Sequence, residues 1–138
     1  MKRLIAISAG VLLASTAAFA QPTSPGRAEI MTSAPTNSVT VTDWYKQTVY
    51  DPSDNKIGEI MDVLISPEGR VTGLIIGVGG FLGAGEKDVA VPFTAVKHTM
   101  KDKKIYLTMD TTKDALKGAP GLKYDGESTS WVPDTSNK

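Results

Sequence analysis

The sequence predicts a small, mainly β domain, an antiparallel barrel or sandwich of five or six short strands. Short runs rich in β-branched residues recur along the chain and turn residues separate them. No segment has the length and periodicity of a long helix. Gly58, Gly73 and Gly77 lie inside such runs and fit the tight bends that a small barrel needs.

The N-terminus has the features of an export signal. Lys2 and Arg3 precede an apolar stretch that ends in Ala18-Phe19-Ala20, with small residues where signal peptidase cleaves. Residues 1–20 are therefore expected to be a cleaved signal peptide. A retained anchor is the alternative, but the stretch is shorter and richer in Ala and Ser than a membrane span of about 20 residues. We expect no stable membrane insertion after cleavage.

A leader and a folded region are expected to follow. Residues 21–42 are rich in Ser, Thr, Pro and Ala without an apolar period, which indicates a flexible leader. The folded domain is expected over residues 43–122. Its five clearest strands are predicted at 44–50, 57–66, 71–78, 88–92 and 105–109, and two short helical turns at 93–96 and 111–116.

Two local questions stay open in this interpretation. Ile57, Ile60 and Leu64 also share one face of a hypothetical helix, although the Ser-Pro-Glu-Gly turn that follows favours a strand and hairpin. Residues 123–138 have the composition of a flexible tail, with Trp131 as the exception. Trp131 either folds back onto the domain or lies exposed.

Charge and cysteine content exclude several functions. Without Lys2 and Arg3 the mature chain has 13 basic and 15 acidic residues, a net charge of −2, so a nucleic-acid partner is not expected. The chain has no cysteine, which excludes disulfides, thiolate metal sites and a cysteine nucleophile. An exported protein without disulfides fits the bacterial periplasm.

Several motifs together resemble the PRC-barrel domain. They are Val49-Tyr50-Asp51, the run IGEIMDVLI at 57–65, Gly69-Arg70-Val71, and GVGGFLGAGEKDVAVPF at 77–93. The resemblance covers roughly Trp44 to Pro120 and is greatest to stand-alone exported bacterial members. It implies an SH3-like antiparallel β-barrel that binds other macromolecules and has no catalytic residues. The chain lacks the transmembrane helix and the RNA-binding domain of better-known members, so their functions are not carried over.

The glycine-rich loop is the most distinctive segment. A phosphate-binding loop would lead into a helix, whereas this loop leads into the predicted strand at 88–92, so no nucleotide cofactor is expected. Phe81 and Leu82 are apolar where a loop is usually polar. The pair either plugs one end of the barrel or contacts a partner. The predicted partner-binding residues are Gly79, Gly80, Phe81, Leu82, Gly83 and Lys87.

A calcium-loop-like spacing gives the alternative site. Asp51, Ser53, Asn55, Glu59 and Asp62 stand at positions 1, 3, 5, 9 and 12 of such a loop, but the glycine of position 6 is replaced and position 12 is not glutamate. The alternative metal-binding set is Asp51, Asn55, Glu59 and Asp62.

No enzyme template is complete. His98 is the single histidine and lies in a polar stretch without a motif-placed partner. The sequence therefore predicts a non-enzymatic periplasmic module, without a cofactor, that binds or scaffolds a protein partner or a second copy of itself. The alternative is an envelope protein that binds a small ligand or a divalent cation through the carboxylates of residues 51–62.

Overall fold

The computed structural model describes residues 28–81 and 85–136 of the chain, with only the backbone given for Gly80 and Phe81. The chain divides into two units, Met1–Thr36 and Asn37–Lys138. Residues 28–36 contain no helix or strand. The unit from Asn37 onward holds all the described secondary structure, so the expected domain limits of 43 and 122 both fall inside it.

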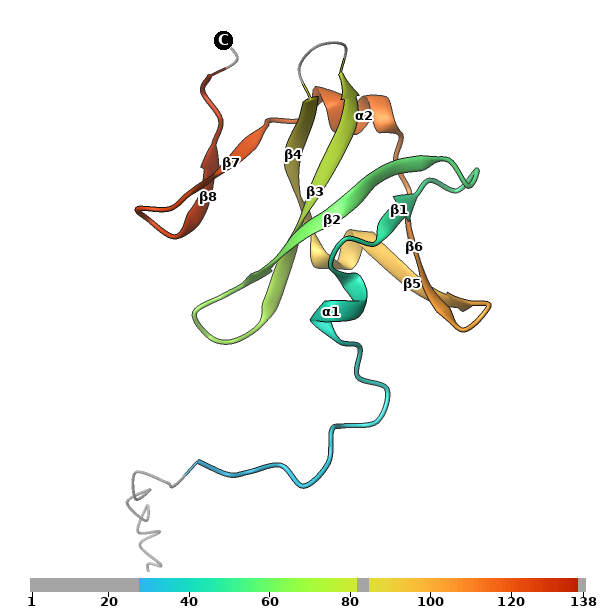
Figure 1. The fold of residues 1–138 in the computed structure, drawn as a ribbon, viewed down its shortest axis with the longest axis vertical. Helices are drawn as coiled ribbons and strands as arrows, with labels where there is room; N and C mark the ends of the chain where they lie inside the picture. Colours follow the sequence, from blue (N-terminus) through green and yellow to red (C-terminus); the bar gives the residue numbers. More distant parts are fainter. Residues whose placement is uncertain (1–27, 82–84, 137–138) are drawn as a thin grey trace, which may run out of the picture. The chain divides into compact units, whose positions relative to one another are not determined.

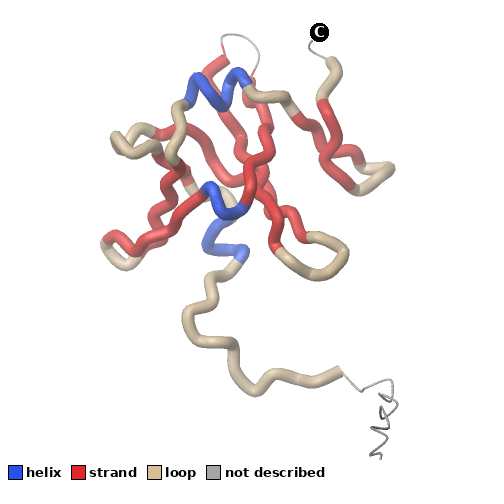
Figure 2. Tube along the Cα trace, turned by 180° about the vertical axis from the view of Figure 1, so that it is seen from behind, coloured by secondary structure: helices blue, strands red, loops and turns tan. Residues whose placement is uncertain are grey.

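The unit that begins at Asn37 is mainly β, as predicted (Figure 1). Its strands are β1 (Thr48–Tyr50), β2 (Lys56–Ile65), β3 (Val71–Phe81), β4 (Gly85–Pro92), β5 (Val96–Lys101), β6 (Lys104–Met109), β7 (Leu122–Asp125) and β8 (Ser130–Pro133). Its helical segments are α1 (Val41–Trp44), the 3₁₀ turn η1 (Phe93–Ala95) and α2 (Lys113–Gly118). Figure 2 shows how short these helical turns are beside the strands.

The strands form one curved sheet in the order β5-β6-β1-β2-β3-β4-β7-β8. All neighbouring pairs are antiparallel except β1 and β6, which are parallel. The long strands β2 and β3 are antiparallel neighbours from the Glu59–Gly77 pair to the Ile65–Val71 pair, and Figure 1 shows their twist, which lets the sheet curl around its core. The described ladder does not close, so β5 and β8 remain as its two edges.

The core lies in the concave side of this sheet. Ile60, Leu74, Ile76, Val89 and Leu107 are fully or almost fully buried there, and each comes from a β-branched or leucine-containing run in the sequence. Burying each such side chain contributes about 1.5–3 kcal/mol. β2 and β3 approach closely at Gly58, where an added Cβ would lie 2.9 Å from the carbonyl oxygen of Gly77.

The strand count is higher than predicted. β5 runs through the polar stretch after η1 that the sequence did not predict as a strand. The expected strand at 44–50 is shorter, because Thr40 caps a helical turn: its hydroxyl accepts a hydrogen bond from the Asp43 N–H at 3.1 Å. The helical alternative for residues 57–65 is wrong, since these residues form β2.

The C-terminal segment also differs from the expected flexible tail. Residues 122–133 form the β7–β8 hairpin, and the Asp125 carboxylate accepts hydrogen bonds from the backbone N–H groups of Glu127 and Ser128 in its turn. Trp131 folds back onto the domain, because its indole Nε1 donates to Asp62 Oδ2 at 2.7 Å. A contact across 69 residues leaves no local signal in the sequence.

Candidate binding surface

The predicted partner loop joins β3 to β4. Gly79 is half-buried within β3, and the backbone of Phe81 pairs with Gly85 at the end of the hairpin. Leu82 and Gly83 lie outside the described residues. Whether the Phe81 and Leu82 side chains pack in the barrel or face a partner stays a prediction.

Lys87 has a structural contact within the domain. Its Nζ donates a hydrogen bond to the carbonyl oxygen of Lys117 at 2.6 Å, and its side chain passes over Gly121. Lys117 lies in the last turn of α2, where a cation interacts favourably with the carbonyl end of the helix. Lys87 therefore fixes α2 against β4.

The carboxylates of the alternative metal set each have separate partners. Asp51 Oδ1 accepts the backbone N–H groups of Ser53 and Asn55 at 2.8 and 2.9 Å, and Asp51 Oδ2 accepts the Asn55 side-chain amide at 3.0 Å. These bonds, the Asn55 side chain first, lower the pKa of the Asp51 carboxyl. Glu59 lies 3.6 Å from Lys56 Nζ, and Asp62 binds Trp131. The described residues contain no cluster of three metal-ligating His, Cys, Asp or Glu side chains.

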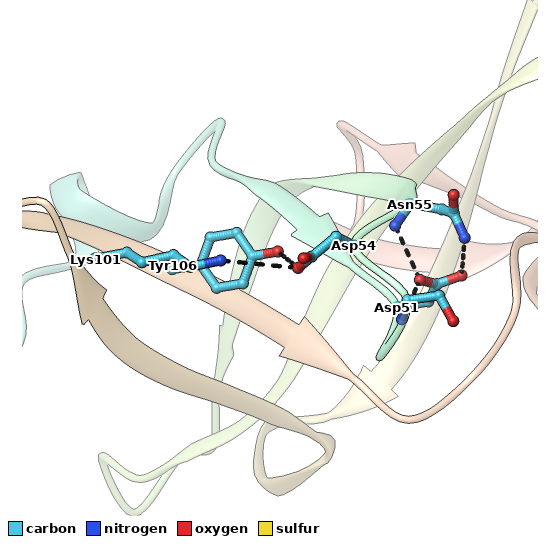
Figure 3. Close-up of polar contacts among 6 residues, drawn as sticks. Asp51, Asp54, Asn55, Lys101 and Tyr106 are labelled. Atoms are coloured by element: carbon cyan, nitrogen blue, oxygen red, sulfur yellow. Dashed lines mark hydrogen bonds and ion pairs between the residues drawn. The ribbon is translucent and has the colours of Figure 1, made fainter.

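An aromatic and charged cluster joins the β1–β2 turn to the β5–β6 hairpin (Figure 3). The Tyr106 hydroxyl donates to Asp54, and the Tyr50 ring stacks on the Tyr106 ring with centroids 4.8 Å apart. Lys101 Nζ lies 4.1 Å from the Tyr106 ring centroid and 3.8 Å from Asp54 Oδ1. The hydrogen bond to Asp54 is the main reason that the pKa of Tyr106 is raised to about 12. This cluster holds the hairpin in place.

A small apolar groove lies beside Trp44. It measures about 70 Å³ and is lined by Val39, Thr40, Val41, Trp44, Val63, Val71 and Phe93. Trp44 is 2% exposed and stacks on Phe93, with ring centroids 5.0 Å apart. The rim residues Val39, Val41 and Val71 are exposed. Among the described residues, no group accepts a hydrogen bond from the buried Trp44 Nε1.

A second, larger groove lies beside the β5–β6 hairpin. It is open, measures about 620 Å³, and is lined by Ser38, Val39, Asp43, Gln47, Met100, Lys103, Lys104 and Ile105. Val39 lines both grooves. Together the two grooves and the β5–β6 hairpin form a surface with an apolar part at Trp44 and a basic part at the hairpin.

Sequence reasoning missed this surface for two reasons. The composition of residues 21–42 predicts a flexible leader that includes Val39 and Val41, and Trp44 lies in the strand predicted at 44–50. The Thr40 and Asp43 pair was the available signal, because a threonine followed three residues later by an acidic residue is typical of a helix start. The polar stretch at residues 97–104 shows no apolar alternation and therefore predicts no strand there.

The curved sheet, its short helical turns and its surface grooves define a small β-barrel module. A family model described as the PRC-barrel domain matches residues 37–116, more than half of the chain. The protein therefore belongs to the PRC-barrel domain family, as the sequence motifs predicted. A search of curated proteins finds no match. The match ends within α2, so the β7–β8 hairpin lies beyond the matched residues.

Within residues 28–81 and 85–136, no helix has the length and apolar character needed to cross a bilayer.

Proposed function

We propose that this protein is a non-enzymatic, periplasmic protein-binding module whose contact surface includes the apolar groove at Trp44. The observation that carries the proposal is the apolar groove itself, whose rim is formed by the exposed residues Val39, Val41 and Val71. Isolated exposed apolar patches often mark contacts. A partner that places an aliphatic side chain in the groove would remove these valines from water.

The size of the groove favours a protein over a small-molecule ligand. At about 70 Å³ it is far smaller than ligand pockets, which measure about 300–1,000 Å³. One aliphatic side chain of a partner suits it better. The export features of residues 1–20 support a periplasmic site of action, with a mature N-terminus at Gln21.

The test compares four forms of the full-length protein in pull-downs from the periplasm. Val71→Asp puts a charge on the groove rim, Phe81→Ser changes the predicted loop, and Met31→Asp places the same charge at an exposed apolar residue outside the groove. We expect Val71→Asp to lose a partner that wild type and Met31→Asp retain.

Each other outcome has a defined meaning. Loss only in Phe81→Ser would assign the contact to the β3–β4 loop and contradict the role of the groove. No partner with any form, together with a monomeric wild type in sedimentation equilibrium, would contradict the binding function. A wild-type dimer that Val71→Asp dissociates would identify a second copy as the partner.

A further inference from the structure

β5 is an open edge of the sheet. It pairs with β6 alone, and it ends the strand order of the described residues. Five of its six residues are exposed, and it contains no proline. The opposite edge, β8, has four residues and ends in Pro133. Natural proteins protect an edge by shortening it, by proline or by charged side chains, lysine above all. β5 is neither short nor interrupted by proline, and its lysines restrict it to an added strand of opposite charge.

The turn of the β5–β6 hairpin determines which backbone groups face the open edge. Asp102 and Lys103 form a two-residue turn with φ values of 51° and 62°, which is typical of a type I′ hairpin. The closing pair, Lys101 and Lys104, must then exchange both of its backbone hydrogen bonds across the hairpin.

Alternation along β5 follows from that closing pair. The N–H and C=O groups of Thr99 and Lys97 point to β6, as those of Lys101 do. The N–H and C=O groups of His98 and Met100 therefore point to the open edge. Two donors and two acceptors are available there for a new strand.

The hairpin is basic while the rest of the domain is acidic. Residues 97–104 are all exposed and contain four lysines and one aspartate, a net charge of +3. The other described residues hold seven lysines and arginines against 14 acidic residues, a net charge of −7. This asymmetry favours a negatively charged partner at β5.

A second copy of this chain does not suit the edge. The antiparallel register that uses both outward residues sets His98 opposite Met100 of the second copy. The same register sets Lys97 of each copy directly opposite Lys101 of the other copy, which makes two lysine–lysine pairs. Like charges directly opposite one another destabilise a strand pair.

The side chains of β5 specify what an added strand would carry. Lys97 and Lys101 lie on one face. An acidic side chain opposite Lys97 would form an ion pair, and one opposite Lys101 would join the pair that its Nζ already makes with Asp54 Oδ1 at 3.8 Å. His98 and Met100 lie on the other face, where the His98 ring is 5.8 Å from the Trp44 ring and Met100 lines the larger groove. Apolar side chains belong opposite these two.

We propose that an extended acidic segment of a partner protein adds to the sheet along β5, with acidic residues opposite Lys97 and Lys101 and apolar residues opposite His98 and Met100. Strand addition to an exposed edge is an established mode of peptide recognition. The inference rests on the proposed protein-binding function, and it specifies the chemistry and the backbone geometry of the partner.

The test uses a blocked seven-residue peptide with glutamate at positions 2 and 6, valine at positions 3 and 5, and threonine elsewhere. It is titrated to about 5 mM into the full mature protein, and backbone amide exchange is followed by NMR. At saturation we expect exchange at the His98 and Met100 amides to slow about tenfold. The Lys97, Thr99 and Lys101 amides, already bonded to β6, should not change.

Backbone methylation of the peptide gives a matched control. The valines pair with His98 and Met100, so their N–H groups face β5. Methyl groups on the two valine nitrogens should abolish binding. A methyl group on the central threonine nitrogen, which faces away, should leave it intact. The proposal would be overturned if the valine-methylated and the threonine-methylated peptides bound equally well. It would also be overturned if the unmethylated peptide caused no saturable change in amide exchange at His98 and Met100.

Two further arms test charge and geometry. A peptide with lysine in place of glutamate should not bind. If anionic vesicles slow amide exchange in β5 and the acidic peptide does not, the partner is a membrane surface and the proposal is overturned.

Met100→Pro removes an outward N–H without breaking a bond to β6, and Met100→Thr is its control. A periplasmic partner that binds Met100→Pro as tightly as wild type would contradict strand addition while the binding function stands. The absence of any partner would contradict both.

Discussion

The two hairpins at the ends of the sheet are attached in a similar way but differ in what they bury. An aromatic side chain holds each one to an aspartate of the β1–β2 region: Tyr106 donates to Asp54, and Trp131 donates to Asp62. The β5–β6 hairpin also contributes Val96, Leu107 and Met109 to the core.

The β7–β8 hairpin contributes no residue to the buried core formed by the described chain. Its one strand partner outside the hairpin is β4, through Asp88 and Leu122. An edge strand anchored in the core is already ordered and loses little further entropy when a partner adds to it. β5 is therefore an ordered edge strand anchored in the core, whereas the β7–β8 hairpin is docked onto the domain.

The largest effect should come from the core side of the β5–β6 hairpin. Leu107 is fully buried, and Leu107→Ala removes its packing and leaves a cavity. We expect the free energy of unfolding, measured by urea denaturation, to fall by about 3 kcal/mol. A loss below about 1 kcal/mol would mean that this hairpin is also only docked.

Trp131→Phe tests the docked hairpin with a smaller expected effect. The variant keeps a six-membered aromatic ring but loses the pyrrole ring with its N–H, which leaves Asp62 Oδ2 without its donor. The free energy of unfolding should therefore fall by about 1–2 kcal/mol. Amide exchange should speed up within Leu122–Asp125 and stay unchanged in β6. A loss as large as that of Leu107→Ala would contradict the distinction between the hairpins.

Asp88 lies where β4 pairs with β7, opposite Leu122. Burial raises the pKa of its carboxyl, and Oδ1 has no hydrogen-bond partner among the described residues. The folded state therefore holds the proton more tightly, and stability should fall as the pH rises through the ordinary value of 3.8 to the higher folded pKa.

Asp88→Asn should remove the loss of stability that wild type shows as the pH rises above 3.8. At neutral pH we expect the variant to be more stable than wild type by less than about 1 kcal/mol, because an uncharged amide costs less to bury and water screens part of the charge of this partly buried group. Thermal melts from pH 3 to 7 measure the effect. Identical pH profiles for the two proteins would show that the Asp88 carboxyl is freely solvated.

The smallest effect concerns the turn of the β5–β6 hairpin. Lys103 has φ of 62°, where this turn type favours glycine, so Lys103→Gly should raise stability by about 0.5 kcal/mol. The same change removes a basic residue, so it should weaken binding of the acidic peptide severalfold. Stronger binding by the variant would contradict an electrostatic role for the hairpin.

Much of the fold could be predicted from local patterns. The runs that became β2, β3, β4 and β6 are rich in β-branched residues bounded by turns, and their burial in the core confirms the pattern. β5 could not be predicted in this way, because five of its residues face solvent and carry no apolar alternation. Its strand state depends on pairing with β6.

The candidate surface was less predictable than the fold. The groove at Trp44 combines Val39 with Val71 and Phe93, which are distant in the sequence and meet only when the sheet curls. The basic stretch at 97–104 can be read from the sequence, but it indicates a binding site for an acidic strand only once β5 is known to be an edge of the sheet. The Trp131 contact with Asp62 shows the same limit for the C-terminal hairpin.

Amide hydrogen exchange of the free, full mature protein tests the central claim most directly. An open and ordered β5 edge predicts alternation: the Lys97, Thr99 and Lys101 amides exchange slowly, while the His98 and Met100 amides exchange at nearly unprotected rates. Protection of His98 and Met100 equal to that of their neighbours would show that the edge is already covered. Rapid exchange at all five would show that β5 is not an ordered template.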